Sequence, residues 1–293
     1  MAEEKPTADG DPERSETDVT ALMDHWWASP FVEFINYNNH QKALFQLTEE
    51  ALTQWRDMNR LREAMAKASR TLNRGDEASK FEKAAERIKA QVKLAEIEYD
   101  NKFAHLRGAY IVLFWSGLEA LVDDVVLAGI EHGHLKTDVV KLEKIRVRLV
   151  DIMSLAPAEL ARKAFDIIRA DVLSQGGMGR FDDLLAAVGL DFAVSKETRD
   201  ALWDMSAIRN LLAHRRGIVD QQFMDRCPGS GQTLGEALTI EAQTIDRFNH
   251  EVYQFVAGLM ERLLVAWELD PDEDADLHAS KSTDEAEPQV LED

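Results

Sequence analysis

The strongest candidate for chemistry in this sequence is one late segment, SAIRNLLAHRRGIVD at residues 206–220. Its polar members interrupt an otherwise apolar helical pattern, and they are Arg209, Asn210, His214, Arg215 and Arg216. Asn210 and His214 are one helical turn apart and share a face, and the long side chain of Arg209 can reach back toward them. The segment therefore predicts a cationic spot that carries an imidazole.

This set of side chains suits a phosphodiester. The imidazole of His214 titrates near neutral pH and can move a proton. The guanidinium of Arg209 stays charged and offers a planar fork to phosphate oxygens, and the amide of Asn210 can orient the nucleophile or the imidazole. In RNA the 2′-hydroxyl can attack the neighbouring phosphorus, so the protein needs to supply only proton transfer and charge stabilisation. Neither a metal nor a cofactor is expected.

A structural interpretation of the same residues stays open. Basic side chains at a helix C-terminus also cap free carbonyls and stabilise the helix dipole, and Gly217 fits such a C-cap. Other candidates are weaker. The EHGH motif (131–134) has too few neighbouring ligands for a metal site and is expected to be a solvated turn. Cys227 has no spacing partner, and Arg107 is expected to meet a carboxylate or to add to an RNA surface.

Composition limits the classes of protein. The chain has 293 residues, of which 45% are hydrophobic, enough for a buried core. A single cysteine excludes an internal disulfide framework. No apolar run approaches the ~20 residues that span a bilayer, and the first residues are acidic, unlike a signal peptide. We expect a cytoplasmic protein without a membrane partner.

The net charge of −20 is concentrated at the two ends of the chain. Residues 1–24 carry −6 and residues 268–293 carry −10, which leaves −4 for the remainder. Such acidic segments repel themselves and cannot form a core, so the tails are expected to be disordered. They either keep the protein soluble or compete with polyanions for a basic surface.

Between the tails the pattern is helical, and the expected fold class is all-α. An aromatic segment (24–37), divided by Pro30, is expected to pack on the body as a cap. Two helices with apolar steps of three and four predict a long antiparallel hairpin over 40–72 and 78–99. A helix over 103–130 is apolar on most sides and belongs inside a bundle. Further helices are expected over 137–153, 157–174, 195–216 and 240–267, with a short helix within 175–194 and a loop over 217–239.

The hexamer RNLLAH matches the R-x4-6-H motif of the HEPN superfamily, and the segment LRGAYIVLFWSGLEALVDDVV (106–126) resembles an earlier core helix of HEPN domains of the RiboL-PSP or MAE type. The resemblance covers about residues 100–267. It does not cover the hairpin or the tails. Together with the charge and apolar patterns, it gives an expected division into an acidic tail (1–23), a cap with hairpin (24–100), a HEPN-like helical bundle (101–267) and a second tail (268–293).

The resemblance implies a metal-independent endoribonuclease that dimerises so that two motifs share a cleft. His214 would then be the general base or acid, Arg209 would stabilise the phosphorane charge, and Asn210 would position the substrate or the imidazole. Arg215 and Arg216 would bind substrate. Glu119 is expected to support the site, since a buried carboxylate needs a partner such as Arg209 or Asn210.

Two functions follow from these expectations. The first is an RNA endonuclease, as a toxin or phage-defence component with an antitoxin or regulatory protein as a further partner. The alternative is a non-catalytic HEPN-like module that binds RNA or protein, in which Arg209 and His214 are caps or packing groups.

Overall fold

The structure is a computed structural model that describes residues 25–136, 155–172 and 177–267. In these ranges every named element is a helix, which confirms the all-α prediction, and the only β pairing is one isolated bridge between Ile218 and Ala237. The helices are α2 (Ser29–Thr71), α3 (Gly75–Arg87), α4 (Lys89–Asp100), α5 (Ala104–Glu131), α7 (Pro157–Val172), α8 (Met178–Ala186), α9 (Lys196–Arg215), α10 (Gln221–Arg226) and α11 (Ala242–Ala266).

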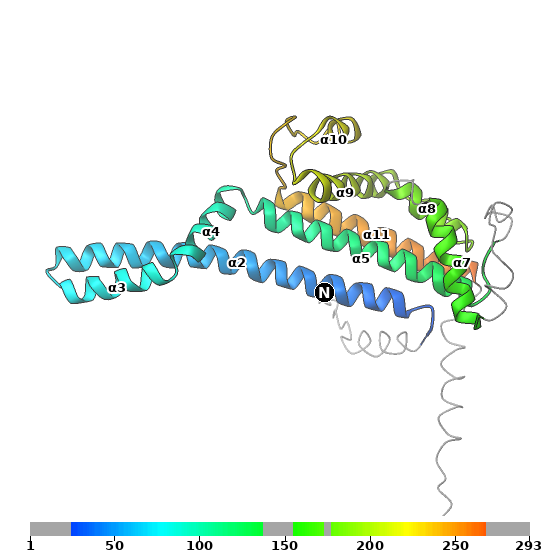
Figure 1. The fold of residues 1–293 in the computed structure, drawn as a ribbon, viewed down its shortest axis with the longest axis horizontal. Coiled ribbons are helices and arrows are strands. Elements are labelled where there is room, and N and C mark those ends of the chain that lie inside the picture. The colour runs from blue at the N-terminus through cyan, green and yellow to red at the C-terminus, as the bar shows by residue number, and fades with distance from the viewer. Residues whose placement is uncertain (1–24, 137–154, 173–176, 268–293) are drawn as a thin grey trace, which may run out of the picture.

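Helix α5 is the centre of a helical bundle. Its sequence is apolar on most sides, and it buries side chains such as Phe114, Leu118 and Val122 completely. Helices α2, α7, α8, α9 and α11 all contact it. Figure 1 shows α2 along one side of α5, α8 and α9 along the opposite side, and α11 beside it. Helix α9, which carries the candidate residues, is therefore fixed against the best-buried element of the fold.

An arm projects from this bundle. Helix α2 continues past the body, and α3 and α4 fold back against it (Figure 1). The predicted hairpin is present, with one difference in detail: its second helix is interrupted at Ile88. The turn at its tip places Asn73 in the left-handed region at φ 58°. Asparagine tolerates this conformation better than most residues do.

The hairpin packs through a different face of its first helix than the apolar pattern predicted. The second helix buries three of its predicted positions, Ala78, Val92 and Ala95, whereas Phe81, Ala85 and Ile88 are half-buried and Tyr99 is exposed. Helix α2, however, buries a mainly small or polar set: Leu52, Arg56, Asn59, Ala66 and Ser69. Its large apolar side chains remain exposed. One reason is that the guanidinium of Arg56 lies 3.3 Å from the centroid of the Tyr99 ring, which joins α2 to α4 through a polar face.

The aromatic segment packs on the body as predicted, but Pro30 does not divide it. Helix α2 begins at Ser29, and Pro30 occupies its first turn, where the missing N–H has no helical partner to lose. Trp27, Phe31 and Phe34 are buried against the bundle. The ring of Trp26 stacks between chain segments, on His132 at 3.4 Å and on Trp267 at 5.5 Å between centroids.

The other body helices lie close to their predicted positions. Helices α7, α9 and α11 correspond to the ranges expected over 157–174, 195–216 and 240–267, and α8 is the expected short helix. The predicted loop over 217–239 contains a short helix, α10, whose first turn is capped by the Asp220 side chain. The helix expected over 137–153 and both acidic tails lie outside the described residues. No described helix combines the length and apolarity that a membrane span requires.

Candidate active site

Helix α9 is held at both ends. At its start, the Ser195 side chain accepts a hydrogen bond from the Thr198 N–H, and the Thr198 hydroxyl donates to Glu251 of α11 at 2.7 Å. At its end, Arg216 adopts a left-handed backbone and Gly217 follows at φ 74°. The last helical turn therefore carries His214 and Arg215, as the sequence predicted.

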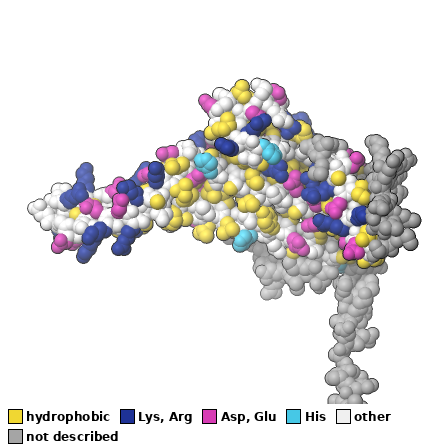
Figure 2. Space-filling model, viewed as in Figure 1, with side chains coloured by type: hydrophobic (Ala, Val, Ile, Leu, Met, Phe, Trp, Pro, Cys, Tyr) yellow, Lys and Arg dark blue, Asp and Glu magenta, His cyan; other side chains and the backbone are white. Residues whose placement is uncertain are grey.

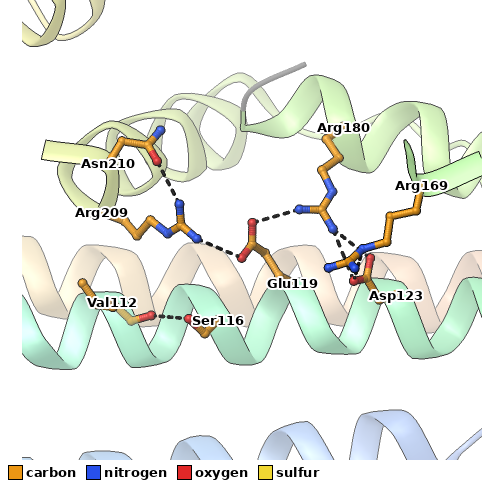
Figure 3. Close-up of polar contacts among 8 residues, drawn as sticks. All are labelled: Val112, Ser116, Glu119, Asp123, Arg169, Arg180, Arg209 and Asn210. Carbon is orange, nitrogen blue, oxygen red and sulfur yellow. Dashed lines mark hydrogen bonds and ion pairs between the residues drawn. The ribbon is translucent and has the colours of Figure 1, made fainter. Parts of the chain in front are cut away.

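Arg209 and Asn210 are joined to each other. Arg209 donates from Nη1 to Oδ1 of Asn210 at 3.0 Å, and its Nη2 lies 3.5 Å from Oε2 of Glu119 on α5. Figure 3 shows the guanidinium between these two groups, pointing from α9 toward α5. Because the side chain is 30% exposed, the cation is fixed by its partners and still reaches solvent. The expectation that Glu119 needs Arg209 as a partner is met.

The carboxylate of Glu119 has a second partner that the sequence did not indicate. Arg180 of α8 donates from Nη1 to Glu119 at 3.1 Å and from Nη2 to both oxygens of Asp123 at 3.0 and 3.2 Å. Arg169 of α7 pairs with the same Asp123 at 3.0 Å. The result is a chain of alternating charges from α7 through α8 and α5 to the guanidinium of Arg209 (Figure 3).

Burial affects the charge of Asp123 in this network. Partial burial raises the pKa of Asp123 above its ordinary value, although Arg180 and Arg169 oppose that rise and Glu119 adds to it. The two arginines thus offset the cost of burying the carboxylate. Arg180 also holds Glu119, and through it the orientation of Arg209.

His214 opens into solvent. Its side chain is exposed, and it lines a cavity of about 450 Å³ between α9 and α10. The lining includes two other predicted site residues, Asn210 and Arg215, but neither Arg209 nor Arg216. Arg215 also pairs with Asp220 at 3.3 Å, across the same cavity. Asn210 is therefore the link between the fixed guanidinium on one side and the accessible imidazole on the other.

Arg226 is a further cation that the sequence pattern did not single out. It lines the His214 cavity and also a second cavity of about 690 Å³ on the other side of α10. There its guanidinium lies 5.9 Å from the ring of Trp203, which is 40% exposed. A cation beside an accessible aromatic face suits a nucleotide, whose phosphate and base need those two groups.

The weaker candidates have structural roles. Arg107 is buried, donates to the Ile240 carbonyl at 3.0 Å and pairs with Glu49 at 2.9 Å, so it meets a carboxylate rather than forming a surface. EHGH forms the predicted exposed turn after α5, with Glu131, His132 and Gly133 exposed, and the His132 and His134 rings also stack on Trp26 and Trp267. Burial, with a smaller contribution from Asp204, raises the pKa of Cys227 to about 12, which keeps its thiol protonated and unreactive.

Among the described residues, no group of three or more histidine, cysteine or acidic side chains has the geometry to hold a metal ion. The arrangement instead offers an exposed imidazole, a fixed guanidinium and an amide between them. Comparisons of this chain with family models, curated proteins and solved structures found no match. The resemblance to HEPN domains therefore rests on the residues of 106–126 and 209–214 themselves.

Proposed function

We propose that the protein is an endoribonuclease of HEPN type that cleaves RNA through its 2′-hydroxyl without a metal ion. The observation that carries the proposal is the placement of Arg209. Its guanidinium is held by Glu119 and Asn210, and Asn210 lines the same cavity as the exposed His214. Arg209, on the side of α9 that faces α5, would supply charge stabilisation, and His214, in the cavity beside α10, would supply proton transfer; these are the two functions that this reaction needs, and Asn210 lies between them.

In the proposed reaction the 2′-oxygen attacks the neighbouring phosphorus, and the bond from phosphorus to the 5′-oxygen of the next nucleotide breaks. His214 takes the proton of the 2′-hydroxyl, and Arg209 stabilises the negative oxygens on phosphorus. A protonated imidazole returns a proton to the leaving 5′-oxygen. The products are a 2′,3′-cyclic phosphate and a 5′-hydroxyl. Arg215 and Arg216 bind phosphates next to the cleaved bond.

One histidine, His214, lines this cavity. Simultaneous acid and base catalysis uses two groups, so the proposal includes a homodimer whose second copy supplies another His214. Arg226 extends the cationic surface away from the cavity toward Trp203. RNA bound there would lie along α10.

Purified protein incubated with a defined RNA in the presence of EDTA tests the proposal. We expect cleavage with cyclic phosphate ends, and a loss of at least about 100-fold for His214→Ala, the usual size of a general acid–base contribution. Arg209→Ala is expected to abolish cleavage as well. His40→Ala is the matched control, because His40 is an exposed histidine on α2, away from the cavity. Equal cleavage by wild type and His214→Ala would contradict the proposal.

The contacts of Arg209 also favour a second candidate, a non-catalytic helical module that binds RNA or protein. Both Nη atoms of Arg209 are used within the protein, as they would be in a purely structural ion pair. For this function, wild type would bind RNA without cutting it. Arg209→Ala would lower the melting temperature, and His214→Ala would leave RNA binding unchanged in a filter-binding assay.

The proposal extends to the biological role: the protein would act as a toxin or phage-defence component, and an antitoxin or regulatory protein would inhibit it. Expression of the wild-type chain in bacteria would then arrest growth, whereas His214→Ala would not. Normal growth with both chains, at equal protein levels, would argue against this role.

A further inference from the structure

The arm carries a row of large apolar side chains that nothing in the described chain covers. We call this row the arm stripe, and it consists of Leu44, Leu47, Trp55, Met58, Leu61 and Met65 on α2 and of Leu72 directly after it. Each of these side chains is between 42% and 67% exposed. Figure 2 shows hydrophobic side chains gathered over the middle of the molecule, where the arm leaves the body, and basic side chains toward the arm's end.

The spacing of the arm stripe is that of a helix that pairs with another helix. Its members follow steps of three and four residues, and Ala51 and Ala68 complete the series. From Leu44 to Leu72 the stripe is about 42 Å long at a rise of about 1.5 Å per residue. Helices α3 and α4 cannot be the partners, because they pack on a different face of α2. A contiguous apolar surface of this length marks an interaction site.

We propose that the arm stripe pairs in antiparallel orientation with the arm stripe of a second copy of this chain. A helix face with heptad spacing carries both the protruding side chains and the gaps between them into which a partner's side chains fit. An identical helix is therefore complementary to it. A closed twofold contact also buries both stripes completely and leaves no apolar surface for further copies. Two arms side by side would form a four-helix bundle with the two α2 helices at its centre.

Charge sets the orientation. The half of the stripe nearer the body, residues 44–57, carries a net charge of −2, and the outer half, residues 58–72, carries +3. Within one chain Glu49 pairs with Arg107, Asp57 with Arg56 and Arg70 with Glu82, so the acidic half presents chiefly Glu50 to a partner and the basic half presents Arg60, Arg62 and Lys67. Antiparallel pairing places the acidic half of each arm beside the basic half of the other, whereas parallel pairing places like charges together.

This contact is distinct from the one that the proposed nuclease would use. The symmetry axis of the paired arms passes near Met58, so the two bodies lie at opposite ends of the pair. The His214 cavities are then far apart, and a shared catalytic cleft would need a second, separate contact between bodies. The proposed arm contact therefore does not depend on the proposed nuclease function, and each can be tested without the other.

Light scattering coupled to size exclusion tests the pairing on the full chain. We expect the double variant Leu47→Glu/Leu61→Glu to halve the mass of the wild-type assembly, because it places four buried carboxylates in the interface. Both side chains are more than half exposed in the single chain, so the melting temperature of the monomer should not fall. Leu160→Glu on α7, also exposed, is the matched control and should keep the wild-type mass.

A monomeric wild type, or an unchanged mass for the double variant, would overturn the proposal. Orientation is tested by disulfide formation between Ala51→Cys and Met65→Cys chains. Antiparallel pairing about Met58 brings these two positions level with each other, so we expect a mixed disulfide when the two variants are combined and little within either variant alone. The buried thiol of Cys227 does not interfere. Efficient disulfide formation within each variant alone would show parallel pairing and would overturn the antiparallel arrangement.

Discussion

At the scale of single residues, Arg180 decides how the candidate site is held. Its guanidinium lies between Glu119 and Asp123, and only 11% of its side chain is exposed. Both carboxylates are themselves partly buried, so each requires a cation nearby to offset the loss of hydration. Arg180 is thus a positioning residue, which acts on Arg209 through Glu119.

We expect Arg180→Met to lower the free energy of unfolding by about 3 kcal/mol, the low end for a buried ion pair that loses one partner. Methionine keeps much of the volume but leaves Glu119 and Asp123 with less compensation. Urea unfolding at neutral pH measures the loss. Arg199→Met is the matched control, because the Arg199–Asp182 pair is more than 40% exposed on both sides and should cost less than about 1 kcal/mol. Equal losses would contradict a special role for Arg180.

Sequence reasoning found part of this network. Arg209, Asn210 and Glu119 could be connected because the first two are neighbours in one helix and a buried glutamate requires a partner. Arg180 and Asp123 could not be connected to them, since no spacing rule relates α8 to the middle of α5. Trp203 and Arg226 were missed for the same reason: the loop after α9 folds α10 back over the helix, and only tertiary structure shows this.

At the scale of elements, close approach between helix α5 and the end of α11 depends on a missing side chain. A Cβ added at Gly129 would lie 2.7 Å from Cζ2 of Trp267 and 3.2 Å from Cβ of Val188. The Trp267 ring has little freedom to move, because its Nε1 donates to the Val188 carbonyl and the ring stacks on His134 and Trp26. The absence of a side chain at Gly129 therefore allows the Trp267 ring at the end of α11 to pack directly against the backbone of α5.

We expect Gly129→Ala to destabilise the protein by about 1–2 kcal/mol, because overpacking in a core costs about 1–3 kcal/mol and exceeds the helix-propensity gain of about 1 kcal/mol. Thermal or urea unfolding measures the change. Gly75→Ala is the matched control: it lies at the start of α3 with nothing within 4 Å of an added Cβ, so it should be neutral or slightly stabilising. A gain in stability from Gly129→Ala would show that the Trp267 ring moves freely.

Helix positions were predictable because their apolar periodicity is strong, and the central place of α5 followed from its composition. The packing of the arm was not predictable in the same way. A stripe of apolar residues indicates which face of a helix avoids water, but it does not say which partner covers that face. For α3 and α4 the partner is α2, while the stripe of α2 itself, from Leu44 to Leu72, stays open within one chain. Pro30 failed as a helix breaker because it stands in a first turn.

At the scale of the whole molecule, four stacked rings join the two ends of the described chain. Trp26 precedes α2, His132 and His134 follow α5, and Trp267 ends α11, and their rings stack on one another. Both acidic tails connect to the chain beside this stack, at residues 24 and 268. The other end of the molecule is the arm, with the basic half of its stripe near the tip.

The same stack makes global stability depend on pH through His134. Partial burial lowers the pKa of His134 below its ordinary value, and the charges of His132 and Lys136 lower it further. The folded protein therefore takes up this proton less readily than the unfolded chain. The stabilisation from the neutral ring is fully present above the ordinary histidine pKa of about 6.5, and it is lost as pH falls through the lowered value.

We expect the free energy of unfolding of the wild type to drop between about pH 7.5 and about pH 5.5 by more than that of His134→Phe, since phenylalanine keeps an aromatic ring in the stack but cannot be protonated. Urea unfolding of both proteins at the two pH values gives the comparison, and only the difference between proteins is assigned to His134. His40→Phe, at an exposed histidine of α2, should follow the wild type. If His134→Phe loses as much stability as the wild type on acidification, protonation at the stack does not weaken the junction of the two chain ends.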